Sequence, residues 1–167
     1  GSIMSESNSI DSQKTALIVI DMQNGFCHPK GEMARGGFDI SASADIVPRV
    51  RRLVRLCRDA GAPVFWSRQE HFPGDETREG RRVATHLAKG KVRVAERGTR
   101  DSEILDDLKE DVQPGDYVFT KHRMSCFFDT TLDTKLRMLG VTTLIISGVA
   151  TNVCVEPTLR DAYFRDY

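Results

Sequence analysis

Ala16-Leu-Ile-Val-Ile20, followed directly by Asp21, is the stretch that decides the fold. A continuous run of apolar, mostly β-branched residues predicts a strand that is buried on both of its faces. Such strands belong to parallel sheets covered by helices, and ligands bind beyond their carboxyl ends. We therefore expect Asp21 to lie at the ligand-binding edge of a parallel sheet.

Three further strands are expected along the chain, at residues 63–67, 117–120 and 143–147. Apolar residues at helical spacing predict helices between them, together with a short helix around Ile104–Leu108. This alternation predicts an α/β fold with a doubly wound, mostly parallel open sheet. We assign residues 15–167 to one such domain, and residues 1–14 to a disordered tail that begins with an expression tag.

Capping residues predict where two of the helices begin, and a proline marks the first turn of a third. Asp45 is the expected N-cap of the helix that carries Val47 and Val50, and Thr130 with Asp133 has the spacing of a capping box. A last helix is expected from about Cys154 onward, with Pro157 in its first turn.

The composition is that of an ordinary globular chain of 167 residues. Lys and Arg together number 24, as do Asp and Glu, so the zero net charge argues for neither nucleic acid nor a membrane as a partner. We interpret the basic clusters at 49–52 and 78–82 as solvated faces. No apolar run has the length of a membrane span, and the polar N-terminus is no signal peptide. The four cysteines lack paired spacing, so we expect reduced thiols in the cytoplasm.

Three chemically active residues follow strands and should meet at one sheet edge: Asp21, Lys121 and Cys154. A helix N-terminus and a nearby lysine are both expected to lower the pKa of the Cys154 thiol. Asp21 can accept the thiol proton and later return it to a leaving amine. The pattern indicates nucleophilic catalysis by cysteine.

The motifs around these residues resemble those of the isochorismatase-like cysteine hydrolases. They are Val19-Ile-Asp-Met-Gln-Asn-Gly-Phe26, Thr120-Lys121 and Ser147-Gly-Val-Ala-Thr-Asn-Val-Cys-Val155. The resemblance implies that Asp21 is the general base and acid, Lys121 the electrostatic partner and Cys154 the nucleophile. It also implies a cis peptide bond between Val149 and Ala150, with an oxyanion hole formed by the N–H groups of Ala150 and Cys154.

The segment from Ser147 to Asp161 is most similar to the ureidoacrylate and N-carbamoylsarcosine amidohydrolase branch. This similarity implies hydrolysis of a C–N bond in a small linear amide or ureide through a thioester intermediate, without a cofactor. We also expect a homo-oligomer. Members of the family usually continue with another strand and helix, whereas this sequence stops at Tyr167, so we expect either that the sequence is incomplete or that a sheet edge is left bare.

The substrate pocket is expected to be lined by residues that follow the strands. Gln69 comes after the second strand, where related amidohydrolases place a substrate-binding amide, whereas Phe128 is expected to pack and Trp66 to lie either in the core or at the pocket rim. The expected lining residues are Gln23, Phe26, Gln69, Arg123, Met124 and Phe127.

Three other interpretations differ in chemistry. Nicotinamidases carry a metal-binding Asp-x-His after the second strand, but here that region reads Trp66-Ser-Arg-Gln-Glu-His71, so we expect no metal site. Cys154 and Arg160 have the C-x5-R spacing of cysteine phosphatases, although no glycine lies between them to form a phosphate cradle. The third alternative is a non-catalytic binding or oligomerisation module on the same fold.

Overall fold

The computed structural model describes residues 11–71, 95–150 and 154–167. Most of the expected tail at 1–14, the basic cluster at 78–82 and part of the turn before Cys154 lie outside the described residues.

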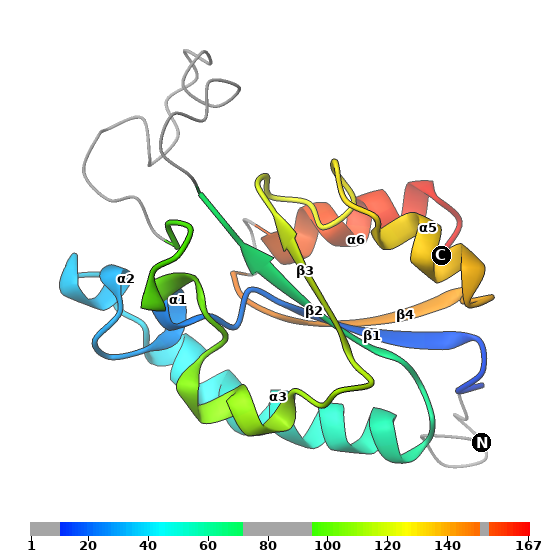
Figure 1. Cartoon of the computed structure of the whole chain (residues 1–167), viewed down its shortest axis with the longest axis horizontal. Coiled ribbons are helices and arrows are strands. Elements are labelled where there is room, and N and C mark those ends of the chain that lie inside the picture. Colours follow the sequence, from blue (N-terminus) through cyan, green and yellow to red (C-terminus); the bar gives the residue numbers. More distant parts are fainter. Residues whose placement is uncertain (1–10, 72–94, 151–153) are drawn as a thin grey trace.

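Four parallel strands form one open sheet in the order β3-β2-β1-β4 (Figure 1). The strands are β1 (Thr15–Ile20), β2 (Val64–Gln69), β3 (Tyr117–Lys121) and β4 (Thr143–Gly148). All four predicted strands are confirmed, and their predicted ends differ from the observed ones by no more than two residues.

Helices cover both faces of the sheet, which confirms the doubly wound α/β fold (Figure 1). The helix α3 (Ser41–Asp59) and the 3-10 helix η3 (Asp106–Asp111) lie on one face, and α5 (Leu132–Met138) and α6 (Glu156–Phe164) lie on the other. Alternate residues of β1 serve the two cores, since Leu17 and Val19 pack on the α3 side whereas Ile18 and Ile20 pack on the α5–α6 side. At the carboxyl end of β1 follow α1 (Asn24–Cys27) and α2 (Glu32–Arg35), which lie close to η2 (Arg100–Ser102).

The predicted N-cap of α3 is wrong. The helix begins at Ser41, so Asp45 lies within it, and Asp39 Oδ1 accepts the Ser41 N–H at 2.9 Å. Because Asp39 satisfies a first-turn N–H, the helix can start one turn earlier than the pattern indicated.

The predicted capping box of α5 does not form either. The Thr130 hydroxyl donates to the Cys126 carbonyl, and the Asp133 carboxylate accepts the Tyr167 hydroxyl at 2.7 Å. Thr130 Oγ1 also accepts the Leu132 N–H at 3.3 Å, but Asp133 is used in a tertiary contact with Tyr167, so the two side chains form no reciprocal cap. For the last helix, α6 starts at Glu156 with Pro157 in its first turn, as expected.

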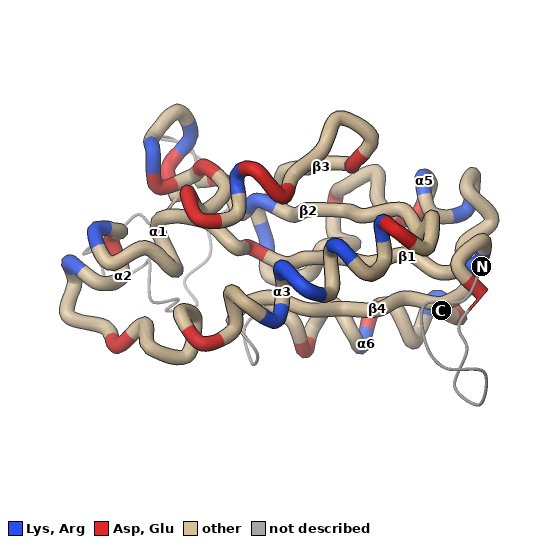
Figure 2. Tube along the Cα trace, turned by 90° about the horizontal axis from the view of Figure 1, so that it is seen from below, with Lys and Arg blue, Asp and Glu red and all other residues tan. Residues whose placement is uncertain are grey.

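The basic side of α3 is more than a solvated face. Arg51 Nε lies 3.0 Å from Asp111 Oδ2 and Arg55 Nε lies 3.3 Å from Asp111 Oδ1, so η3 neutralises part of the helix. Figure 2 shows acidic segments beside this basic helix. Arg49 and Arg52 are exposed, as the sequence predicted.

Among the described residues, no helix combines the length and the apolarity needed to cross a lipid bilayer.

Candidate active site

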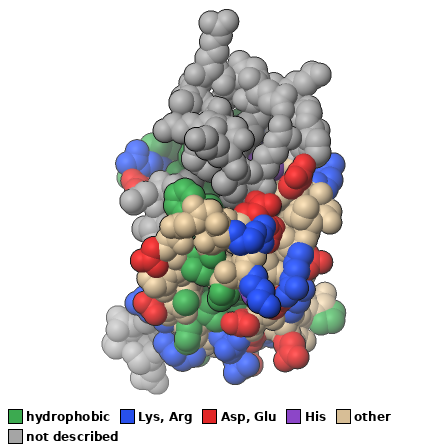
Figure 3. Space-filling view, turned by 90° about the vertical axis from the view of Figure 1, so that its left-hand side faces the viewer, with side chains coloured by type: hydrophobic (Ala, Val, Ile, Leu, Met, Phe, Trp, Pro, Cys, Tyr) green, Lys and Arg blue, Asp and Glu red, His purple; other side chains and the backbone are tan. Residues whose placement is uncertain are grey.

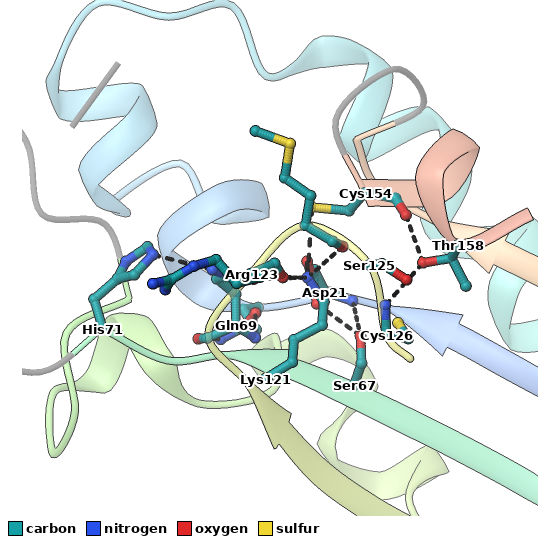
Figure 4. Close-up of polar contacts among 12 residues, drawn as sticks. Asp21, Ser67, Gln69, His71, Lys121, Arg123, Ser125, Cys126, Cys154 and Thr158 are labelled. Carbon is teal, nitrogen blue, oxygen red and sulfur yellow. Dashed lines mark hydrogen bonds and ion pairs between the residues drawn. The ribbon is translucent and has the colours of Figure 1, made fainter. Parts of the chain in front are cut away.

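The ends of β1 and β3 and the start of the α6 segment bring Asp21, Lys121 and Cys154 together (Figure 4). Lys121 ends β3, and its side chain reaches past the intervening strand β2, so that Nζ lies 3.0 Å from Asp21 Oδ2 and 3.6 Å from Cys154 Sγ. All three residues are buried, and Asp21 and Lys121 are each only 1% exposed. The predicted convergence at the carboxyl edge of the sheet is confirmed.

The backbone turns sharply at Asp21, which has a φ of 54°. Aspartate tolerates this left-handed conformation better than most residues. The Asp21 N–H donates to the carbonyl of Ser67 at 3.2 Å and to its Oγ at 3.1 Å, while Ser67 Oγ–H donates to Asp21 Oδ1 at 2.7 Å. These contacts leave Oδ2 as the oxygen that faces Lys121.

The Lys121 ammonium is surrounded by acceptors. It donates to Gln69 Oε1 at 2.6 Å and to the carbonyls of Arg123 and Met124 at 2.9 Å each, in addition to its ion pair with Asp21. Burial alone would lower the pKa of Lys121, but the charge of Asp21 opposes it and the net pKa is raised. Lys121 is therefore a fixed cation and not a proton acceptor.

The Cys154 thiol differs from the sequence-based expectation. Burial first, and the negative charge of Asp21 second, raise its pKa to about 12, although Lys121 acts in the opposite direction. The expected lowering of this pKa is wrong, because the burial needed to assemble the triad outweighs the cation. With its pKa raised, the thiol needs a base in order to react, and the Asp21 carboxylate is bound to the same Lys121 ammonium group that contacts the sulfur.

The expected oxyanion hole is only partly open. The Cys154 N–H donates to the Ala150 carbonyl at 3.0 Å, so this N–H already has an acceptor. The Val149–Ala150 peptide bond is cis, and Ala150 is exposed. Within the described part of the chain, the Ala150 N–H has no hydrogen-bond acceptor. Just before it, Gly148 (φ 129°) closely approaches β1, where an added Cβ would lie 2.2 Å from the Ile20 carbonyl oxygen.

Two of the expected substrate-binding residues have their polar groups occupied within the protein. The Gln23 amide clamps the end of β2, since its Nε2 donates to the Gln69 carbonyl at 2.8 Å and its Oε1 accepts the Gln69 N–H at 2.7 Å. The Gln69 amide binds Lys121 through Oε1 and His71 through Nε2. Neither glutamine has the free amide that the expectation required, because both strand ends need partners for their buried polar groups.

The two phenylalanines after β3 differ from the prediction, in which Phe127 lined the pocket and Phe128 packed in the core. Phe127 is only 5% exposed and packs in the α5–α6 core, whereas Phe128, expected to pack, is 51% exposed. Met124 is 43% exposed and Arg123 is half-buried, with their carbonyls on Lys121. Phe26 is half-buried against the α3-side core. Met124 and Arg123, whose carbonyls contact Lys121, keep side-chain surface available beside the triad, whereas Phe127 does not.

Sequence reasoning missed Ser67 and underrated His71. Ser67 is fully buried in a strand whose preceding residues are apolar, and this polar residue in an apolar run was the available signal. Trp66 belongs to the α3-side core, where its Nε1 donates to Asp116 at 3.0 Å.

Two alternative sites were considered in the sequence, a phosphate-binding loop and a metal site. Arg160 pairs with Glu156 at 2.9 Å on the outside of α6 with its side chain 71% exposed, so it does not close a phosphate loop around Cys154. Among the described residues, no group of three His, Cys, Asp or Glu side chains is placed to hold a metal ion.

A separate cavity of about 390 Å³ lies between α1, α2 and η2, and no triad residue lines it. Arg35 pairs with Asp101 there at 3.0 Å, and burial followed by the charge of Asp101 raises the pKa of Glu32 to about 7. Figure 3 shows the end of the molecule that carries these elements, where acidic, basic and hydrophobic side chains are interspersed. Several of its charged side chains pair with neighbouring residues and no triad residue lines it, so this cavity gives no reason to place the chemistry away from the triad.

Comparison with known proteins supports the same family. The isochorismatase domain model matches residues 15–167. Ureidoacrylate amidohydrolase RutB of Methylobacterium radiotolerans is 36% identical over 170 residues, which is 95% of this chain and 65% of that protein. The corresponding protein of Methylorubrum extorquens is 37% identical, covering 95% of this chain and 68% of that protein. The chain thus spans about two thirds of the length of these curated relatives.

Solved structures show the same fold. A cysteine hydrolase from Pseudomonas syringae pv. phaseolicola has a TM-score of 0.80 and 35% identity, covering 95% of this chain and 70% of that one. N-carbamoylsarcosine amidase from Thermoplasma acidophilum has a TM-score of 0.75 and 29% identity, covering 92% and 78% of the two chains. On the match of its sequence over residues 15–167 and of its fold, the chain belongs to the isochorismatase family.

Proposed function

We propose that this chain hydrolyses a C–N bond in a small amide or ureide, with Cys154 as nucleophile, Asp21 as general base and acid, and Lys121 as the fixed cation. The observation that carries the proposal is a buried thiol whose sulfur lies 3.6 Å from the Lys121 ammonium, which itself lies 3.0 Å from the Asp21 carboxylate. A structural cysteine needs no such neighbours, whereas a nucleophilic one needs both a base and a charge partner.

The acylation step follows from this arrangement. Asp21 takes the thiol proton as the Cys154 sulfur attacks the carbonyl carbon, a C–S bond forms, and the carbonyl electron pair moves onto oxygen. We assign the stabilisation of this oxyanion to the Ala150 N–H, since the Cys154 N–H already has an acceptor. When the tetrahedral intermediate collapses, the C–N bond breaks and Asp21 returns the proton to the departing nitrogen.

Deacylation reverses the proton traffic. Asp21 takes a proton from water as its oxygen attacks the thioester, the C–S bond breaks, and the proton passes back to the sulfur. The nitrogen leaves as ammonia or an amine. The acyl part leaves as a carboxylic acid from an amide, or from a ureide as a carbamic acid by way of an S-thiocarbamate. Throughout, Lys121 balances the negative charge that moves between Asp21 and Cys154.

The substrate class rests on the relatives. The proteins at 36% and 37% identity are ureidoacrylate amidohydrolases, and a structural relative is an N-carbamoylsarcosine amidase. A ureido or N-carbamoyl compound is therefore the first substrate to test. Exposed Met124 and half-buried Arg123 and Phe26 are the side chains we propose to line its pocket.

A panel of small ureides, N-carbamoyl amino acids and linear amides, assayed for ammonia release, tests the proposal. We expect turnover of at least one ureide or carbamoyl compound by the wild type, with a Cys154 acyl adduct seen by intact mass after an acid quench. Binding of these compounds without turnover or adduct would instead support a non-catalytic module. Activity that a chelator abolished and a metal restored would contradict the proposed chemistry.

Two further expectations are checked by direct measurement. The homo-oligomer stays a prediction, to be measured by analytical ultracentrifugation. The cytoplasmic location, inferred from the thiols, also stays a prediction, to be tested by fractionation of the source cells.

A further inference from the structure

The middle strand β2 lies between the two strands that supply the charged pair. Its Ser67 stands opposite Ile20, the residue before Asp21, and its Gln69 stands opposite Lys121. The last residues of β2 therefore flank the carboxylate on one side and the ammonium on the other.

Ser67 and Gln69 also share a face of the sheet. Residues two apart on a strand point the same way, and Phe65, two before Ser67, packs in the α5–α6 core that includes Cys154. Trp66 packs in the α3-side core, so Arg68, two residues later, faces away from the triad. In agreement, Arg68 Nε donates to the Ser102 carbonyl at 2.9 Å.

The Ser67 hydroxyl has its donor and an acceptor position committed to one residue. It donates to Asp21 Oδ1 at 2.7 Å and accepts the Asp21 N–H at 3.1 Å. Held in this way, the Asp21 carboxylate cannot rotate freely, and its second oxygen, Oδ2, stays directed at Lys121.

Gln69 is committed in the same way. An ammonium group has only donors, so the oxygen of the amide must face Lys121 and its nitrogen must donate to His71 Nε2 at 3.0 Å. This leaves His71 Nε2 as an acceptor, and it fixes the orientation of the amide. The backbone N–H and carbonyl of Gln69 are held by Gln23, so the whole residue is anchored.

We infer that Ser67 and Gln69 are the positioning residues of the site, Ser67 orienting the Asp21 carboxylate and Gln69 orienting the Lys121 ammonium through a His71–Gln69–Lys121 chain. The inference rests on the proposed hydrolase function and deepens it. It also replaces the expectation that Gln69 contacts the substrate.

Steady-state kinetics show whether Gln69 orients Lys121 or binds the substrate. In Gln69→Met we expect kcat to fall on the order of tenfold to a hundredfold with KM within about threefold of wild type, since substrate contacts remain but Lys121 loses a fixed acceptor. A raised KM with an unchanged kcat would mean that Gln69 binds substrate and would overturn the inference.

Ser67→Ala should give a similar fall in kcat and a shift of the acidic limb of the pH–rate profile to higher pH. The reason is that a lost hydrogen bond to a carboxylate makes that group easier to protonate. Ser67→Thr keeps the hydroxyl, so the acidic limb of its pH–rate profile should lie at the wild-type pH. An unmoved limb and unchanged kcat in Ser67→Ala would remove Ser67 from the inference.

Arg68→Met is the matched control, from the same strand but the opposite face, and it should leave kcat and the limb unchanged. Proton–nitrogen NMR of the Lys121 ammonium adds a test that needs no substrate. We expect its hydrogen exchange to quicken about fivefold in Gln69→Met, as for one lost hydrogen bond, and not in Arg68→Met. If wild type turns over no compound, the proposed function fails while this exchange still decides the positioning role.

Discussion

The ion pair at the carboxyl edge of the sheet and those on the α3–η3 face differ in how far their side chains are buried. The Asp21 and Lys121 side chains are 2% and 0% exposed, whereas Arg51 and Arg55, which pair with Asp111, are 33% and 65% exposed. Removing two charges from water costs more than their attraction commonly returns, so a buried pair is a poor source of stability. The pairs on the α3–η3 face keep their arginines partly in water, although the Asp111 side chain is only 7% exposed, so they avoid part of that cost. The difference fits the proposal that the buried pair serves chemistry, whereas the arginine–Asp111 pairs join η3 to α3.

The largest expected contrast is in activity. Asp21→Asn keeps the shape of the side chain but cannot carry the thiol proton, so turnover should fall on the order of a thousandfold or more. Asp111→Asn, the same change on the α3–η3 face, should leave turnover near wild type. Both are measured with a substrate that the wild type hydrolyses. Equal losses in the two variants would erase the distinction between the regions.

Stability should show the next largest contrast. Lys121→Met leaves Asp21 as an uncompensated buried carboxylate and should lower the free energy of unfolding by about 3–5 kcal/mol. Arg51→Met on the surface should cost about 1 kcal/mol or less. Urea denaturation of both proteins at neutral pH makes the comparison, and adding Asp21→Asn to Lys121→Met should recover much of the loss. If the double variant were no more stable than Lys121→Met, the loss of stability in Lys121→Met would not come from an uncompensated charge on Asp21.

The pH dependence of Cys154 alkylation tests whether the thiol at the carboxyl edge of the sheet is activated at rest. Because its pKa is raised to about 12, its alkylation by iodoacetamide should rise about tenfold per pH unit up to at least pH 9 without a plateau. Asp21→Asn removes the negative charge that helps to raise this pKa, so the same rate measured at pH 8 should increase. Wild-type alkylation that levels off below pH 7 would mean that Lys121 and the helix terminus do activate the thiol at rest.

The smallest effect is expected at Glu32, at the cavity between α1, α2 and η2. Its pKa rises from 4.5 in the unfolded chain to about 7 in the fold, so its contribution is fully present below pH 4.5 and is lost as the pH rises through 7. Glu32→Gln should therefore raise Tm by a few degrees (about 2–4 °C) at pH 8 and leave it unchanged at pH 4. Calorimetry at the two pH values checks this, and a gain at pH 4 alone would have the wrong sign.

The strands were predictable because their signal is local. The strand β1 is buried along its whole length, and Asp21 follows directly where its apolar run ends. The edge strand β3 is only partly buried, and Lys121 at its end is its one buried residue. Their convergence with Cys154 follows from the rule that parallel strands end at one edge.

The environment of each group was not predictable in the same way. The pKa of Cys154 depends on how deeply α6 and β3 bury it, and a sequence does not report depth. Gln23 and Gln69 look like substrate ligands because they are amides near the base, yet each satisfies backbone or ammonium groups 46 or more residues away. The exchanged places of Phe127 and Phe128 depend on the winding of the loop after β3, for which neighbouring phenylalanines give no signal.

Turnover by Cys154→Ser, measured beside Cys57→Ser on the best ureide or amide of the panel, tests the central claim most directly. Serine is nearly isosteric with cysteine, but its hydroxyl is a far weaker nucleophile in this setting, so Cys154→Ser should fold normally and lose turnover by about a thousandfold or more. Cys57 is buried in the α3-side core away from the triad, and Cys57→Ser should retain substantial activity. Wild-type-like turnover by a folded Cys154→Ser protein would contradict the assignment of the nucleophile.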